Sequence, residues 1–98
     1  TEPIVHHRLV YLDIADPSSY ATYRRNMEPL LAEHGGRFVL DVEGEPTIHG
    51  ASFQPRRVLL IGFPSGEAAE RFFADPRYVA VRAAHFEPAV RATVAVGL

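Results

Sequence analysis

The order of apolar segments along the chain predicts an α+β fold, in which a four-stranded antiparallel sheet carries helices on one face. Three observations lead to this prediction: segments of alternating apolar and polar residues, helical segments that begin at capping residues, and their order β-α-β-β-α-β. The length of 98 residues, with 47% hydrophobic and 22% charged residues, is typical of one folded domain. We expect that domain to span residues 1–98.

The first strand is predicted over residues 6–14 because its side chains alternate between two faces. One face receives Val10, Leu12 and Ile14, and the other receives His7, Leu9, Tyr11 and Asp13. A helix is predicted directly after it. Asp16 can cap free backbone N–H groups, and Pro17 suits the first helical turn.

The first helix is predicted to continue to a glycine pair at residues 35–36, since glycine adopts the left-handed conformation that ends helices. Its apolar and aromatic stripe consists of Tyr20, Tyr23, Met27, Leu30, Leu31 and His34. Pro29 lies inside the segment and is expected to kink or split the helix.

The second strand is predicted over residues 37–42, with Phe38, Leu40 and Val42 on one face. A turn-rich connection over residues 43–55 follows. The third strand, over residues 57–63, is apolar on both faces, which predicts burial on both sides.

The second helical region is predicted to begin at Ser65 and to continue over residues 67–74. Asp75 and Pro76 open a further short helix that reaches about His85, and Pro88 prevents its extension. The last strand is predicted over residues 92–96. This order is the split β-α-β, or ferredoxin-like, arrangement.

A sheet with helices on one side leaves its other face uncovered, and Leu9, Val58 and Leu60 are predicted to lie there. An exposed apolar face of that size indicates an interface. Two copies packed face to face about a twofold axis would bury it, so we predict a homodimer.

Several segments resemble one known family, the domain of unknown function 1330. The resemblance rests on the sequences Leu12-Asp13-Ile14-Ala15-Asp16-Pro17, Glu33-His34-Gly35-Gly36-Arg37-Phe38, Pro55-Arg56-Arg57-Val58-Leu59-Leu60-Ile61-Gly62-Phe63-Pro64-Ser65 and Asp75-Pro76-Arg77-Tyr78. It implies a small dimeric α/β-barrel protein with ferredoxin-like protomers, and it implies little about function. Where the family usually carries acidic residues, this chain has His49 and Gly62; the missing side chain at Gly62 could open space for a ligand.

Composition excludes several function classes. A net charge of −2 argues against nucleic acid as a partner, and the absence of cysteine excludes disulfides and thiolate sites. The longest apolar run, residues 58–63, is far shorter than a membrane span of about 20 residues. We expect a cytoplasmic protein with no membrane partner, no cofactor and no built-in metal site, because no ligand spacing matches a known motif.

The candidate catalytic residues are His34 and His7, since histidine titrates near neutral pH. His34 lies at the end of the predicted helix, where interaction with the helix dipole is the favoured interpretation and a general base is the alternative. His7, Tyr11 and Asp13 share the open sheet face. They could form a site with perturbed pKa values or a polar patch in the dimer interface, and both alternatives are kept.

The candidate ligand-binding residues are Arg57, Arg37, Tyr23 and Tyr78, together with Tyr11 and Asp13. Arginine forks bind carboxylates, but for Arg37, Arg56 and Arg57 the favoured interpretation is pairing with Asp13, Asp41, Glu43 or Glu45 across the strands, or plain solvation. Tyrosines at helical spacing usually belong to the core, with the hydroxyl at its rim.

Two function classes follow, and the sequence does not choose between enzyme and binding protein. The first is a protein that binds a small molecule between the sheet and the helices. The alternative is a cofactor-independent enzyme, similar to monooxygenases or isomerases, that acts on a small organic acid or aromatic. On that alternative His34 or His7 acts as the base, and Arg57 or Arg37 stabilises a developing anion.

Overall fold

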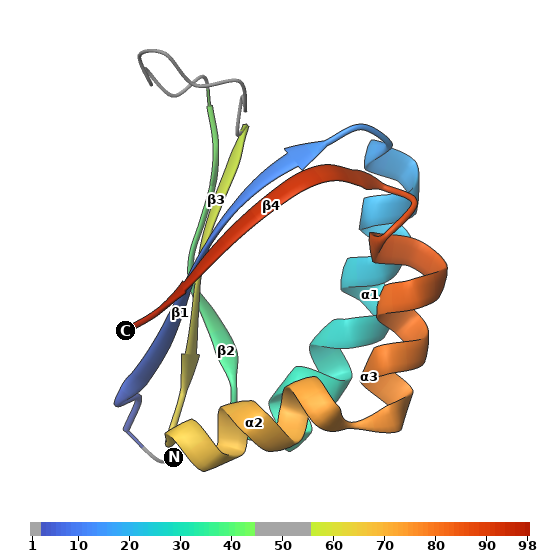
Figure 1. Ribbon diagram of the computed structural model, residues 1–98. Helices are drawn as coiled ribbons and strands as arrows, with labels where there is room; N and C mark the ends of the chain where they lie inside the picture. The colour runs from blue at the N-terminus through green and yellow to red at the C-terminus, as the bar shows by residue number, and fades with distance from the viewer. Residues whose placement is uncertain (1–2, 45–55) are drawn as a thin grey trace.

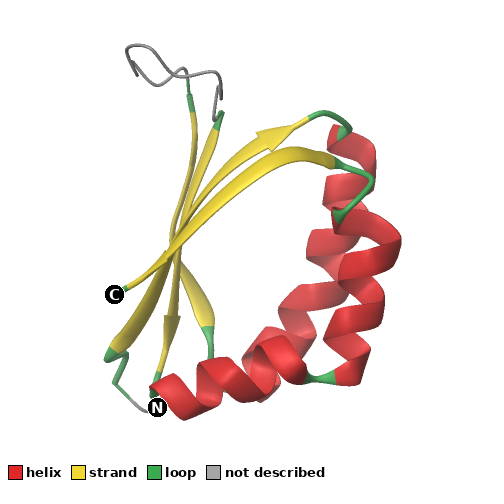
Figure 2. Cartoon of the chain, viewed as in Figure 1, coloured by secondary structure: helices red, strands yellow, loops and turns green. Residues whose placement is uncertain are grey.

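The predicted α+β arrangement is confirmed by a computed structural model, which describes residues 3–44 and 56–98 (Figure 1). The elements are β1 (His6–Ile14), α1 (Pro17–Glu33), β2 (Arg37–Glu43), β3 (Arg57–Phe63), α2 (Gly66–Ala74), α3 (Pro76–Val81), the π-helical turn η1 (Arg82–Phe86) and β4 (Val90–Gly97). The strands form one antiparallel sheet in the order β2-β3-β1-β4. All helices lie on one side of it, which we call the helix face (Figure 2).

The first helix begins at the predicted cap and ends at Glu33, just before the glycine pair. The carboxylate of Asp16 accepts hydrogen bonds from the backbone N–H groups of Ser18 at 3.1 Å and Ser19 at 3.2 Å. The predicted split at Pro29 is wrong, because α1 is continuous through Glu33. Met27 and Leu31, on either side of the proline, are buried against the sheet, and their packing offsets the hydrogen bond that proline cannot donate.

The glycine pair ends α1 as predicted. Gly35 has a φ of 77°, and its N–H and that of Gly36 donate to the carbonyls of Ala32 and Leu31 at 3.0 and 2.9 Å. A Cβ atom on Gly36 would lie 2.5 Å from Leu31 Cδ1 and 3.0 Å from Phe63 Cε1. Glycine therefore lets the chain turn directly against the core.

The predicted alternation along β2 is wrong. Phe38 is opposite Ile61 on the helix face, but the register then shifts between Phe38 and Leu40. This bulge places Leu40 opposite Leu60 and Val42 opposite Val58, on the other face. A bulge leaves no clear trace in an alternating sequence, so the pattern alone could not reveal the change of face.

The second helical region has both predicted caps. Ser65 Oγ accepts from the N–H of Ala68 at 3.0 Å, and Asp75 Oδ1 accepts from the N–H of Arg77 at 2.9 Å. The helix predicted to reach His85 changes to the π-helical turn η1 after Val81. The last strand, β4, is longer than predicted at both ends.

The hydrophobic core lies between the helix face and the helices. The sheet contributes Val10, Leu12, Leu59, Ile61 and Phe63, and α1 contributes Tyr20, Tyr23, Met27 and Leu31. Phe63 and Phe72 are fully buried, with ring centroids 5.9 Å apart. Burial of such side chains supplies the main driving force for folding.

The opposite side of the sheet, which we call the outer face, is apolar and uncovered by the described helices (Figure 2). It consists of Leu9, Tyr11, Leu40, Val42, Val58, Leu60, Val94 and Val96. Four of these side chains, on the two edge strands, are between 44% and 45% exposed. The predicted apolar face is therefore present. No described helix is both long and apolar enough to cross a membrane.

Replacing Gly36 by Ala tests the close approach at the end of α1. The added Cβ must displace the buried Leu31, so we expect the free energy of unfolding to fall by about 1–3 kcal/mol in urea denaturation. Gly44→Ala is the matched control, because no described atom lies within 4 Å of its Cβ position, and we expect a change within about 0.5 kcal/mol. Equal effects of the two substitutions would contradict this packing.

Candidate functional site

A cavity of about 90 Å³ lies between the helix face and the helices, and we call it the central cavity. Apolar side chains from all four strands and from α1, α2 and η1 form most of its wall. Its polar or charged side chains include Arg8, Tyr23, Tyr78, Arg82 and Thr93. Small-molecule sites commonly combine an apolar wall with a few placed polar groups in this way.

Two tyrosine hydroxyls meet in the wall of the central cavity. The oxygen atoms of Tyr23 and Tyr78 are 2.9 Å apart, and the residues are 6% and 4% exposed. Burial raises the pKa of both phenols, so they are neutral at physiological pH. Each hydroxyl carries one proton, and their mutual bond uses only one, which leaves the other free for a ligand.

Arg8 reaches the same cavity from β1. It shares the helix face with Val10 and Leu12, and its guanidinium carbon lies 4.1 Å from the centroid of the Phe73 ring. Its Nε is buried and has no hydrogen-bond partner within the part of the chain that the structure describes. Buried donors are nearly always bonded in folded proteins, so the unbonded Nε is an exception among the described residues.

The charge of the cavity wall is positive. Arg8 and Arg82 contribute guanidinium groups, and the described lining includes no aspartate or glutamate. The chain as a whole carries a net charge of −2. The positive wall is therefore a local arrangement that favours a negatively charged occupant.

The central cavity opens to solvent beside β4. Most of its lining is buried or partly buried, but Arg82, Thr93 and Ala95 are exposed. These three residues belong to η1 and β4, so the mouth lies between these elements. Single π-helical turns are frequent at functional sites.

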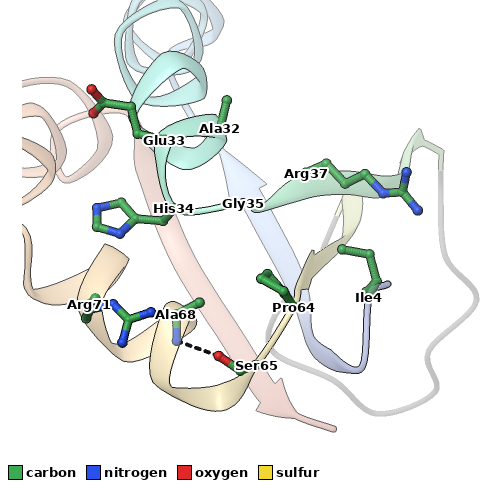
Figure 3. A pocket seen from close by; sticks show the side chains of 10 residues that line it. All are labelled: Ile4, Ala32, Glu33, His34, Gly35, Arg37, Pro64, Ser65, Ala68 and Arg71. Carbon is green, nitrogen blue, oxygen red and sulfur yellow. Dashed lines mark hydrogen bonds between the residues drawn. The ribbon is translucent and has the colours of Figure 1, made fainter. Parts of the chain in front are cut away.

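Of the residues predicted from the sequence, Tyr23 and Tyr78 are brought together in the central cavity. His34 and Arg37 instead line a separate groove of about 550 Å³, which we call the His34 groove. Figure 3 shows the imidazole of His34 and the guanidinium of Arg37 directed to opposite sides of it. The two side chains do not converge on one point.

His34 is held by a carboxylate from the junction of α2 and α3. Its Nε2 lies 3.1 Å from Oδ2 of Asp75, and since an ionised carboxylate only accepts, Nε2 donates. Asp75 also accepts from the Arg77 guanidinium at 2.8 Å. These bonds hold the pKa of Asp75 well below its usual range, and the bond from Arg77 contributes most. His34 thus joins the end of α1 to the second helical region.

Arg57 is paired with two of the four carboxylates that the sequence offered as partners, Asp41 and Glu43. Its guanidinium donates to Asp41 at 2.6 and 3.0 Å and to Glu43 at 2.8 Å, and Arg24 donates to Asp41 at 2.8 Å. Partial burial would raise the pKa of Asp41, but the bonds from the two arginines outweigh it and lower that pKa. This network lies in a third, open hollow and not in the central cavity.

His7, Tyr11 and Asp13 lie along β1 on the outer face, as the alternation predicts. Tyr11 is flanked by Val58 and Val94, and Asp13 has Arg91 Nη1 at 3.7 Å. None of the three lines the central cavity. Across residues 3–44 and 56–98, no group of three or more His, Asp or Glu side chains could hold a metal ion.

The expectation that Gly62 opens space for a ligand is wrong. A Cβ atom at this position would lie 2.5 Å from Ile4 Cγ2 and 2.9 Å from Val39 Cγ2, so these side chains fill the space. His49, the other departure from the family pattern, lies outside the described residues.

Sequence reasoning missed Arg8 and Arg82, which carry the charge of the central cavity. The position of Arg8 could have been predicted, because residues 8, 10 and 12 of a strand lie on the same face. Alternation therefore places this arginine beside Val10 and Leu12 on the buried face. Arg82 gave no comparable signal, because its position depends on the π-helical turn.

Replacing Asp75 by Asn tests the charge of the His34–Asp75–Arg77 cluster, because Asn preserves the helix cap. The pKa of Asp75 is lower in the folded state than the value of about 3.9 in the unfolded chain, so its ionised carboxylate stabilises the fold above that pH. This stabilisation is lost as the pH falls through the pKa of the folded state. We therefore expect the difference in the free energy of unfolding between wild type and Asp75→Asn to be largest above about pH 5 and to decrease below that pH. Urea unfolding at several pH values measures this, and a difference independent of pH would contradict it.

Comparison with solved structures shows the same fold in other proteins. A protein of unknown function from Rhodopseudomonas palustris matches with a TM-score of 0.82 and 24% identity, over 95% of this chain and 79% of that one. A dimeric protein of unknown function with a ferredoxin-like fold, from Bacteroides fragilis, matches with a TM-score of 0.61 and 13% identity, over 95% and 93%. A candidate antibiotic biosynthesis monooxygenase from Nitrosomonas europaea matches with a TM-score of 0.65 and 18% identity, over 95% and 86%.

These identities show a common fold and no more. A comparison with curated proteins finds no match. The model of one family, described as a domain of unknown function (DUF1330), matches residues 7–97. That match covers nearly the whole chain and agrees with the resemblance of its motifs, and the protein therefore belongs to the DUF1330 family.

Proposed function

We propose that the protein binds a small organic molecule in the central cavity and does so as a homodimer. The observation that carries the binding proposal is the buried Nε of Arg8, which has no acceptor among the described residues and lines the same cavity as the Tyr23–Tyr78 pair. A single domain over residues 1–98, a cytoplasmic location and the absence of nucleic-acid or membrane partners are further parts of this proposal.

The size of the central cavity limits the ligand. A cavity of roughly 150 Å³ accommodates benzene in a protein core, whereas this one measures about 90 Å³. The enclosed part of a ligand is therefore limited to a few heavy atoms while the side chains keep their positions. A longer molecule would extend through the mouth beside Thr93 and Ala95.

The homodimer is supported by the outer face. Its apolar side chains come from all four strands, and a second copy presents the same surface to it. Two sheets pack face to face at a distance of about 10 Å, with side chains between them. The Bacteroides fragilis neighbour, which has the same fold, is described as dimeric.

The enzymatic alternative has less support from the geometry. The neighbour from Nitrosomonas europaea is a candidate monooxygenase, and Arg8 with a tyrosine hydroxyl could stabilise an oxyanion. However, no histidine or carboxylate is among the described residues that line the central cavity. The candidate bases His34 and His7 lie in the His34 groove and on the outer face, so we favour binding over catalysis.

Nuclear magnetic resonance with two small probes, butanoate and butanamide, tests whether the central cavity admits a ligand. We expect at least one of them to shift the signals of Val10, Tyr23 and Phe86, which surround the cavity. Ala95→Phe places a ring at the mouth, and we expect it to weaken binding about tenfold or more, since a blocked cavity loses its apolar contacts. No shift with either probe, or unchanged binding by Ala95→Phe, would refute the proposed function.

Sedimentation of the wild type and of Val94→Asp tests the dimer. We expect the wild type at twice 10.9 kDa and the variant at 10.9 kDa, because a charge buried between two apolar sheets lacks a partner. Val79→Asp is the matched control, since Val79 is 50% exposed on α3, away from the sheet, and we expect it to sediment as the dimer. A monomeric wild type would contradict this proposal, as would a dimeric Val94→Asp.

A further inference from the structure

We infer that the ligand of the central cavity is a small carboxylate with a short hydrocarbon chain, and that Arg8 binds its carboxylate group. This inference rests on the proposed function, because it names the chemical class that the cavity selects. It follows from three observations: Arg8 Nε has no acceptor among the described residues, the tyrosine pair has a second hydroxyl proton to donate, and the rest of the cavity wall is mostly apolar.

Arg8 differs from the two partly buried arginines Arg24 and Arg57, which share the carboxylate of Asp41. Within the described residues, no carboxylate lies within ion-pair distance of Arg8, whose guanidinium instead covers the ring of Phe73. Because a guanidinium binds a carboxylate through two parallel hydrogen bonds, the missing partner is best supplied by a ligand of that shape.

The tyrosine pair lies beside the same aromatic ring. The ring centroid of Phe73 is 5.7 Å from that of Tyr78, while the Arg8 guanidinium carbon is 4.1 Å from it. The hydroxyl proton that the Tyr23–Tyr78 bond leaves free provides a further donor on this side of the cavity. Arg8 and the tyrosine pair thus present donors to an oxygen anion, and neither offers a negative charge.

The rest of the wall distinguishes a carboxylate from an inorganic anion. Leu12, Met27 and Ile61 are at most 5% exposed, line the cavity and offer no hydrogen-bond donor. Phosphate or sulfate would have to lose its hydration along that side without gaining hydrogen bonds. A carboxylate with a short alkyl chain places its oxygens at Arg8 and its chain against the apolar wall.

Arg82 supports the same ligand class from outside. It is exposed at the mouth, on η1, and its guanidinium carbon lies 5.6 Å from the Phe86 ring centroid. A positive charge at an entrance raises the local concentration of anions and their rate of entry. The two arginines therefore mark the outer and inner ends of one route for a small anion.

The test compares butanoate with butanamide, which have the same size and differ in charge at pH 7. We expect the wild type to bind butanoate about tenfold or more tightly than butanamide, because charge-assisted hydrogen bonds are the stronger ones. Arg8→Met keeps the length of the side chain and should remove this preference. Arg71→Met removes the same charge in the His34 groove, outside the central cavity, and should leave the preference unchanged.

Arg8→Lys decides the question if Arg8→Met does not fold, since it retains the charge without the fork. We expect it to reduce the preference for butanoate without abolishing it. Equal affinities of the wild type for the two probes would overturn the inference while the proposed binding function stands. A preference that survives in Arg8→Met would also overturn it. If the wild type binds neither probe, the proposed function itself fails.

Discussion

The structure depends on which residues of β1 face the helices. This strand lies between β3 and β4, so its register fixes both faces of the sheet at once. Arg8, Val10 and Leu12 point toward the helices, whereas Leu9 and Tyr11 point outward. A slip of one residue would exchange the two sets, leaving Arg8 on the outer face and removing the charge from the central cavity. The cavity and the apolar outer face are therefore two consequences of one alternation.

Placing an arginine on the helix face is costly, because a charge loses its hydration there. The ring of Phe73 compensates part of this cost through a cation–π contact. The buried Nε receives no such compensation from the described residues. Its position is therefore explained by the ligand that we propose for the central cavity and not by a partner within the described residues. The tyrosine pair also holds a donor in the cavity wall, since only one of its two hydroxyl protons takes part in the Tyr23–Tyr78 bond.

Local features of the fold could be predicted from the sequence, whereas features that depend on tertiary contacts could not. The caps at Asp16, Ser65 and Asp75 act within three residues, and each was predicted. The bulge in β2 follows from pairing with β3, so alternation misplaced Leu40 and Val42. Similarly, Tyr23 and Tyr78 were predicted singly, but their contact joins residues 55 positions apart. Alternation places Arg8 on the helix face, but it does not show that the surroundings there lack a carboxylate, because those contacts come from α2, α3 and η1.

The Nε–H signal of Arg8 in a nitrogen-15 NMR spectrum reports on the one atom that the proposed binding mode depends on. If that atom lies in the central cavity, its N–H exchanges with solvent more slowly than that of Arg71, whose side chain is 63% exposed, and butanoate shifts its signal more than an equal concentration of butanamide does. An Arg8 N–H that exchanges as fast as that of Arg71 and ignores both probes would contradict the assignment of Arg8 to the central cavity.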